Sequence, residues 1–384
     1  MVSRRVQDIL ASQTVAISNK VSRLKAEGQD IISFSMGEPD FNTPQNIVQS
    51  CIDSLNSGFT HYTPSPGIPE LRTAVAEIAC RENGIGCKPG NVLVTPTKHA
   101  IFMACLAYLD PGDEVILPDP AWASYEACIR LACAKPVFVP TEFENDFVID
   151  PALIEAAITP KTKMMIINTP SNPTGCVIPE KVLREIAKIA IEHDIMILSD
   201  EIYEKVIYEG KHVSMASFPG MFGRTITVSG FSKTYAMTGW RVGWAIADEE
   251  HIININKLQS HSISCCVSFA QQAAVEALVG PQDERKRFLK IFKQRRDLAI
   301  DLIDDMKGLD VNVPQGAFYL FPKYSADIKS SVLAHKLLDS AHVAVTPGSA
   351  FGPAGEGFFR ISYATSEDQI REGFARIKKF LDEY

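Results

Sequence analysis

The sequence lacks the features that mark metal-binding, disulfide-stabilised and membrane-spanning proteins. Its nine cysteines are scattered without a C-x-x-C pair, and its eight histidines have no zinc-ligand spacing. No stretch approaches the roughly 18 consecutive apolar residues of a membrane span. No apolar run of signal-peptide character follows the basic residues near the N-terminus. We therefore expect free thiols in a reducing compartment, a cytoplasmic location, no metal centre and no membrane partner.

Positive charge is also scarce. The chain has 38 Lys and Arg against 46 Asp and Glu, which gives a net charge of -8. A nucleic-acid-binding surface usually carries an excess of basic residues, so we expect no nucleic-acid partner. With 384 residues, 46% of them hydrophobic, the chain is long enough for a large core and about two domains.

Apolar runs and helical patterns alternate through the middle of the chain. The apolar runs have no alternating polar face, so we expect strands that are buried on both sides. Alternation of such strands with helices favours an α/β fold with a mainly parallel sheet covered by two helical layers. The predicted strands are residues 91–95, 115–117, 163–168, 195–199 and 225–228, and the predicted helices are 100–109, 122–132 and 179–193.

The two ends of the chain differ from the middle. Residues 1–45 contain one helical pattern and a proline-containing turn. From Asp283 onward we expect a long charged helix, short strands and a terminal helix. We therefore predict a large domain at residues 46–280 and a smaller domain formed by 1–45 together with 281–384.

Lys233 lies in the most informative segment of the chain. It follows Val228-Ser229-Gly230-Phe231-Ser232, and Arg241 comes shortly after it. A lysine between small residues can form a Schiff base with an aldehyde, and the planar guanidinium group of an arginine can hold a phosphate. The pattern therefore favours a phosphorylated aldehyde cofactor, although a surface lysine near a surface arginine would give the same residues.

Polar residues follow three of the predicted strands, at the sheet edge where parallel sheets bind ligands. Asp200 could pair with a pyridine nitrogen and keep it protonated, or it could be a solvated loop residue. Asn172, in a proline-rich turn, could donate its amide to a phenolate or a carboxylate, or belong to an ordinary loop. Lys98 and His99 begin a helix whose backbone amides suit a phosphate.

Three further side chains have both a functional and a structural interpretation. Arg360 lies in an apolar run, and a buried arginine is costly without an anionic partner. It is therefore either a clamp for a substrate carboxylate or half of a structural ion pair. Trp122 could stack on an aromatic cofactor or pack in the core. Tyr62 lies in a rigid exposed turn, which indicates a dimer interface because tyrosine is common in interfaces.

Together these segments resemble the class I aminotransferases, which are pyridoxal 5'-phosphate enzymes of fold type I. The resemblance extends from Gly37-Glu38-Pro39-Asp40-Phe41 to Phe359-Arg360-Ile361-Ser362-Tyr363-Ala364, and Gly230 to Gly243 matches the lysine signature of the family at every position. The chain is most similar to the aspartate aminotransferase-like subgroup of bacteria and archaea. The resemblance implies a large domain with a mainly parallel seven-stranded sheet and a smaller α+β domain from both termini.

The resemblance also implies roles for the catalytic candidates. Lys233 would form the Schiff base and move the proton between the substrate and the cofactor. Asp200 would pair with the pyridine nitrogen, and Trp122 would stack on the ring. Tyr203 and Asn172 would donate hydrogen bonds to the phenolate oxygen and keep the pKa of the imine low.

Phosphate binding and assembly follow from the same resemblance. Arg241 and the backbone around Lys98 and His99 would hold the phosphate, and Tyr62 would reach the phosphate of a neighbouring subunit in a homodimer with shared sites. Two departures affect these contacts. The turn Thr95-Pro96-Thr97-Lys98 is one residue shorter than usual and lacks its glycines, and Gly230 stands where the family often has a phosphate-binding serine.

Substrate binding is assigned in the same way. The substrate α-carboxylate would be bound by Arg360, Asn172 and the backbone at Gly37, and the distal carboxylate by Lys98, Ser12 and Thr14. We therefore expect ping-pong transamination between L-aspartate and 2-oxoglutarate. Aromatic amino acids, alanine and prephenate are alternative substrates, and a pyridoxal-phosphate-dependent lyase on the same fold is an alternative reaction.

Overall fold

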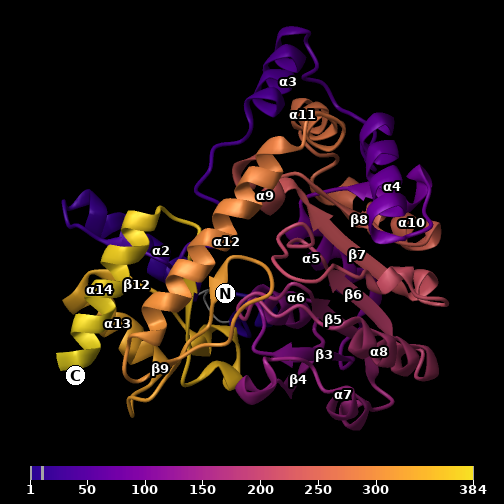
Figure 1. Ribbon diagram of the computed structural model, residues 1–384. Helices are drawn as coiled ribbons and strands as arrows, with labels where there is room; N and C mark the ends of the chain where they lie inside the picture. Colours follow the sequence, from indigo (N-terminus) through magenta and orange to yellow (C-terminus); the bar gives the residue numbers. More distant parts are fainter. Residues whose placement is uncertain (1, 10–12, 384) are drawn as a thin grey trace.

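The computed structural model describes residues 2–9 and 13–383. Its central feature is a seven-stranded sheet in the order β2-β8-β7-β6-β5-β3-β4 (Figure 1). Neighbouring strands are parallel except at β8, which runs antiparallel to both β2 and β7. The strands are β2 (Val92–Val94), β3 (Glu114–Asp119), β4 (Lys135–Pro140), β5 (Thr162–Asn168), β6 (Met196–Asp200), β7 (Thr225–Gly230) and β8 (Gly243–Ile246). The mainly parallel sheet is thus confirmed.

Two strands of this sheet, β4 and β8, are not among the predicted ones. β4 contains Pro136 and ends at Pro140, and proline is confined to edge strands because it donates no hydrogen bond. β4 lies at the edge of the sheet, where these prolines are tolerated. β8 has only four residues and begins with Gly243, so its apolar pattern is too short to indicate a strand.

Both faces of the sheet are buried, because alternate strand residues contact different helical layers. In β5, Met164 and Ile166 pack with the first layer, whereas Met165 and Ile167 pack against the second. The first layer is α5 (Thr97–Tyr108), α6 (Ser124–Leu131) and α10 (Glu249–Ser262). The second layer is α4 (Pro69–Asn83), α7 (Pro151–Ala157), α8 (Glu180–Glu192) and α11 (Ser268–Val279), with α3 (Gln45–Asn56) packed on α11.

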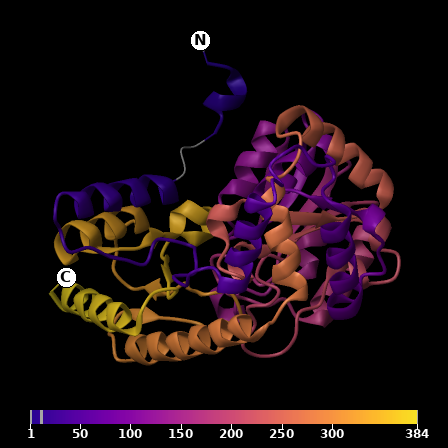
Figure 2. The same cartoon turned by 90° about the horizontal axis from the view of Figure 1, so that it is seen from above.

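The two ends of the chain together form a smaller α+β part beside the sheet (Figures 1 and 2). β1 (Ile32–Ser33) pairs in parallel with β12 (Val343–Ala344), which joins the N-terminal segment to the C-terminal one. Helix α12 (Asp283–Asp304) runs from the sheet-containing part into the smaller part (Figure 1). The domain limits at residues 46 and 280 stay a prediction.

The remaining elements are α1 (Arg4–Gln7), α2 (Gln13–Ala26), α9 (Phe231–Thr234), β9 (Leu309–Asp310), β10 (Tyr319–Leu320), β11 (Lys323–Tyr324), α13 (Ser330–Ala341), β13 (Thr346–Pro347), β14 (Phe359–Ser362) and α14 (Glu367–Glu383).

The sheet register brings polar residues together at one edge. Asn168, the last residue of β5, is opposite Asp200, the last residue of β6, and Asp200 is opposite Val228 of β7. Helix α9, which contains Lys233, follows β7 directly. Three consecutive strands therefore end beside the same space.

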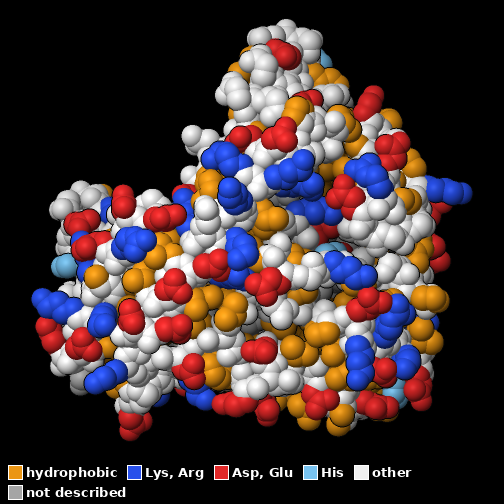
Figure 3. Space-filling view, in the orientation of Figure 1, with side chains coloured by type: hydrophobic (Ala, Val, Ile, Leu, Met, Phe, Trp, Pro, Cys, Tyr) orange, Lys and Arg blue, Asp and Glu red, His pale blue; other side chains and the backbone are white. Residues whose placement is uncertain are grey.

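The surface has no single dominant charge on the face shown in Figure 3, where acidic and basic side chains are interspersed. Over residues 2–9 and 13–383, none of the helices is both long enough and apolar enough to cross a membrane.

Candidate active site

A cavity of about 400 Å³ lies where β5, β6 and β7 end. Residues from the large sheet, from the Gly37 segment and from β10 and β14 line it together. Four of the lining side chains are cationic and one is a carboxylate, which suits a molecule with several negative charges. The cationic residues are Lys98, Lys233, Arg241 and Arg360, and the carboxylate is Asp200.

Asp200 is a buried carboxylate without a cationic partner. Its side chain accepts one hydrogen bond from the Tyr125 hydroxyl at 2.8 Å and another from the Ile202 amide at 3.1 Å. Among the described residues, none makes an ion pair with it. Burial raises the pKa of Asp200 to about 6, although the bond from Tyr125 acts in the opposite direction. A positively charged group in the cavity would stabilise its ionised form.

Lys233 points its amine at the N-terminal segment. The Nζ atom donates a hydrogen bond to the Gly37 carbonyl at 2.6 Å. Burial lowers the pKa of Lys233 to about 8, and the neighbouring Arg360 and Arg241 act in the same direction while Glu38 opposes them. A larger fraction of neutral amine at neutral pH makes Lys233 a better nucleophile and base than an exposed lysine.

Arg360 is 2% exposed and lies in the middle of β14. Its guanidinium group donates to the Asn172 side-chain oxygen at 2.9 Å and to the Ser35 carbonyl at 2.7 Å. Within the described part of the chain it has no ion pair, and its Nε atom has no hydrogen-bond partner. The structural ion pair left open by the sequence is therefore wrong for these residues, and an anionic ligand would balance the buried charge.

Lys98 and Trp122 form another wall of the cavity. The Lys98 ammonium group lies 4.6 Å from the centre of the Trp122 ring, a cation–π contact. The neighbouring Thr97 hydroxyl donates to the Ser229 carbonyl at 2.8 Å. A Cβ atom at Gly230 would lie 2.7 Å from that hydroxyl oxygen. Gly230 thus leaves room for Thr97 at the shortened turn.

Not every predicted residue lies at the cavity. Tyr62 is 90% exposed and does not line the cavity of its own chain. The His99 ring contacts the Ser262 hydroxyl at 2.9 Å, and its amide donates to the Pro96 carbonyl. Ser12 lies outside the described residues. Thr14 belongs to α2, but its side chain also lies outside them.

Two tyrosines at the site are absent from the sequence prediction. Tyr125 holds Asp200, and Tyr319 contacts both Tyr203 and Arg360. Tyr125 could have been found from the sequence, because it lies three residues after Trp122 in a predicted helix and residues three apart lie on one helical face. Tyr319 gives no signal in the sequence, since only the pairing of β10 with β14 brings it to the cavity.

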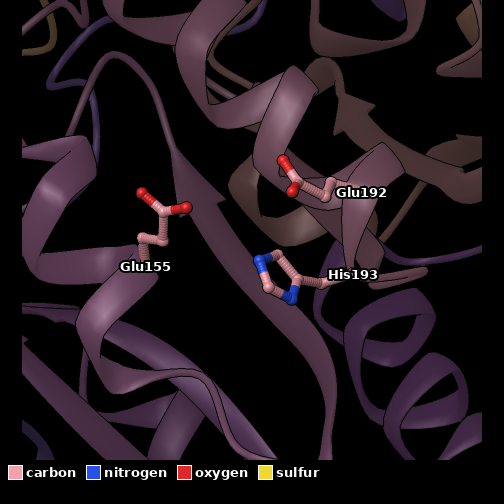
Figure 4. Close-up of side chains that lie close together, drawn as sticks. All are labelled: Glu155, Glu192 and His193. Atoms are coloured by element: carbon pink, nitrogen blue, oxygen red, sulfur yellow. The ribbon is translucent and has the colours of Figure 1, made fainter.

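Within residues 2–9 and 13–383, two groups of side chains lie close enough together to hold a metal ion. Glu155, Glu192 and His193 are exposed at the ends of α7 and α8, where the three side chains face one another (Figure 4). Glu192 and His193 shortly precede β6, so this group lies near the amino end of that strand, whereas the cavity lies at the carboxyl end. In the second group, Glu201 and Glu204 already accept hydrogen bonds from His212, Ser199, Ser214, Ser229 and Asn83.

The structure has a mainly parallel sheet covered on both faces, and a lysine, a buried carboxylate and a buried arginine surround one cavity at its edge. This is the architecture of fold type I aminotransferases. The chain belongs to the aminotransferase class I and II family, whose model matches residues 29–377, and it is an aminotransferase.

Relatives from three organisms cover almost the whole chain. A probable aspartate/prephenate aminotransferase of Aquifex aeolicus is 43% identical over 394 residues, which span 100% of this chain and 99% of the relative. Aromatic-amino-acid aminotransferase 2 of Thermococcus litoralis is 44% identical and spans 92% of each chain. The structure of the Thermus thermophilus aspartate aminotransferase with maleate has a TM-score of 0.94 and 41% identity, and the match covers 99% of both chains.

Proposed function

We propose that this protein transfers the amino group of L-aspartate to 2-oxoglutarate by a ping-pong mechanism, with pyridoxal 5'-phosphate as its cofactor. The observation that carries the proposal is the position of Lys233. Its amine lines one cavity of an aminotransferase together with Asp200 and Arg360. Over residues 2–9 and 13–383, neither of these two buried charges has an ion-pair partner. Each of the three groups suits one part of the reaction. Lys233 would anchor the cofactor, Asp200 would balance the charge on its ring, and Arg360 would recognise the substrate.

The lining residues fit pyridoxal phosphate. When bound, this cofactor supplies an aldehyde that links to a lysine and a ring that takes up electrons from the substrate. Asp200 would pair with the ring nitrogen, because the buried carboxylate needs a positive partner. The exposed Arg241 and the amides of Thr97 and Lys98, which begin α5, would hold the phosphate. Tyr203 and Asn172 would hold the phenolate oxygen, and Trp122 would lie against the ring.

The other steps belong to the chain's own side chains. Arg360 would bind the substrate α-carboxylate with its guanidinium group, while Asn172 and Ser35 hold that group in place. Lys233 would then hold and transfer the proton of the substrate α-carbon at its Nζ atom, because the fraction of neutral amine is raised by burial.

Preference for a dicarboxylate would come from Lys98. It adds a positive charge at the Trp122 side of the cavity, where an apolar substrate would leave that charge without a partner. The maleate in the Thermus thermophilus relative is a dicarboxylate, which supports this preference. The Thermococcus litoralis relative supports aromatic amino acids as the second substrate class.

We also propose a homodimer in which Tyr62 contacts the cofactor phosphate of the partner subunit. Tyr62 is 90% exposed, and other apolar side chains exposed on nearby elements include Ile263 and Val267. Exposed apolar residues of this kind are typical of interfaces.

A visible spectrum tests the function directly. The purified protein, loaded with pyridoxal phosphate, is expected to show the absorbance of a lysine-linked cofactor. L-Aspartate alone should convert it to the aminated form, and 2-oxoglutarate should restore it. Absorbance that responds to phenylalanine but not to aspartate would favour the aromatic alternative. Absence of the lysine-linked absorbance would contradict the proposal.

A further inference from the structure

Tyr319 contacts two residues to which the proposed function gives different tasks: Arg360 would bind the substrate, and Tyr203 would bind the cofactor. It is 1% exposed, lies in β10 and pairs with Ser362 of β14, close to Arg360. The Arg360 guanidinium group lies 4.5 Å from the centre of the Tyr319 ring, and the ring lines the cavity. One face of Tyr319 therefore packs against the group that would bind the substrate carboxylate.

The Tyr319 hydroxyl contacts Tyr203 rather than Arg360. It lies 2.7 Å from the hydroxyl of Tyr203, and it has no other hydrogen-bond partner among the described residues. Each hydroxyl carries one proton. If Tyr203 donates its proton to the cofactor, the bond between the two hydroxyls must use the proton of Tyr319. This donation polarises Tyr203 and makes it a better donor.

Gly37 fits closely against the same hydroxyl. A Cβ atom at Gly37 would lie 2.6 Å from the Tyr319 oxygen, so a larger residue there would displace the hydroxyl. The carbonyl of Gly37 accepts the hydrogen bond from Lys233. The position of Tyr319 is thus fixed from the side of the N-terminal segment as well as by β14.

We propose that Tyr319 is a positioning residue that acts through Tyr203: its hydroxyl directs the Tyr203 proton toward the phenolate oxygen of the cofactor, while its ring supports Arg360. This inference rests on the proposed function. A hydrogen bond from Tyr203 stabilises negative charge on the phenolate oxygen. The proton that this oxygen shares with the cofactor–lysine linkage is therefore lost more easily. Removal of the Tyr319 hydroxyl should therefore make that proton harder to remove.

The test is a pH titration of the visible absorbance of the pyridoxal-phosphate-loaded protein. Wild type, Tyr319→Phe, Tyr203→Phe and the double variant are compared, with Tyr324→Phe as the control because its hydroxyl bonds to Ile328, away from the cavity. Tyr319→Phe should raise the titration midpoint by about 0.3 to 1 pH unit. The double variant should titrate like Tyr203→Phe alone, because the two residues act in series. The control should titrate like wild type.

Two results would overturn the inference. One is a midpoint of Tyr319→Phe equal to that of wild type, and the other is a shift that persists unchanged in the Tyr203→Phe background. A second measurement separates positioning from general packing, since phenylalanine keeps the ring on Arg360. The dissociation constant of succinate should stay within about twofold of wild type, and a large loss would show a merely structural role. Failure of wild type itself to show the lysine-linked absorbance would instead contradict the proposed function.

Discussion

The two walls of the cavity are built differently. Asp200 and Lys233 belong to the sheet wall. Asp200 is the last residue of β6, Lys233 follows β7 in α9, and both strands are hydrogen-bonded on both sides. Arg360, Tyr319 and Gly37 belong to the terminal wall, which rests on short strands and on contacts between distant segments. The bond from Arg360 to Ser35 spans 325 positions of the sequence.

This difference separates two tasks. The sheet wall holds Asp200 and Lys233, which would bind the cofactor, and a rigid support is useful there because small displacements are costly in catalysis. The terminal wall holds Arg360, which would recognise the substrate α-carboxylate. The bond from Lys233 to the Gly37 carbonyl joins the two walls. Loss of Asp200 or Lys233 should therefore affect cofactor chemistry, and loss of Arg360 should affect substrate binding. Tyr319 is the exception in the terminal wall, because its hydroxyl acts on the cofactor through Tyr203.

Lys233→Ala should cause the largest loss of activity of any variant in the sheet wall. Loss of the amine removes both the anchor and the base, so turnover of aspartate should fall by roughly 10⁴-fold or more. The lysine-linked absorbance should disappear in the same spectrum. Lys188→Ala, at an exposed site, serves as the control and should behave like wild type. Retention of turnover and absorbance by Lys233→Ala would exclude Lys233 as the anchor.

Lys98→Ala should weaken the preference for a dicarboxylate substrate. Loss of this positive charge should lower kcat/KM for aspartate by about 10- to 100-fold, because the distal carboxylate loses a charged hydrogen-bond partner. For alanine and phenylalanine we expect a change of less than about threefold. Steady-state kinetics with the three amino acids gives the comparison, and an equal loss for all three would show that Lys98 has no role in selecting dicarboxylates.

The lowered pKa of Lys233 predicts how the cofactor-free protein captures pyridoxal phosphate. Only the neutral amine attacks an aldehyde, and its fraction grows as the pH rises through the pKa of about 8. The capture rate, followed by absorbance, should increase between about pH 7 and 9 and level off above that range. A midpoint near the ordinary lysine value of about 10.4 would contradict the effect of burial.

The smallest expected effect is on the free energy of unfolding, through the His212–Glu201 pair next to the sheet wall. The His212 side chain is 7% exposed and contacts the Glu201 carboxylate at 2.7 Å. Burial opposes the charged imidazole, but Glu201 outweighs it and raises the pKa of His212. The stabilisation is therefore complete below about pH 6.5 and is lost as the pH rises through the folded-state pKa.

A His212→Asn variant tests this account. It should lower the free energy of unfolding by about 2 kcal/mol at pH 6 and by less at pH 9, as measured by urea denaturation. Succinate binding by the loaded variant should match wild type, because Arg360 lies in the other wall. A stability difference that grows with pH would show that the sign of this linkage is wrong.

The sheet wall could be predicted from the sequence more fully than the terminal wall. The buried strands ending at Asn168 and Asp200 have nearly continuous apolar patterns, so these strands and the edge that carries polar residues follow from periodicity. The order of the strands in the sheet comes from the structure alone. β4 and β8 were harder to predict, because proline and short length weaken their patterns.

The terminal wall depends on contacts that no local pattern indicates. Arg360 was identified by its charge within an apolar run, but its partners come from Ser35 and Asn172. Tyr319 lies in a two-residue strand, and its neighbours follow only from the pairing of β10 with β14. The roles of the cofactor-binding residues came from the family resemblance rather than from periodicity.

The division between the two walls is tested most directly by cofactor binding to Asp200→Ala and Arg360→Ala. Each cofactor-free variant is titrated with pyridoxal phosphate, and each loaded variant with succinate. Asp200→Ala should bind the cofactor at least about 10-fold more weakly, whereas Arg360→Ala should bind it within about twofold of wild type. For succinate, Arg360→Ala should lose more affinity than Asp200→Ala. A loss of cofactor affinity in Arg360→Ala as large as that in Asp200→Ala would contradict the division.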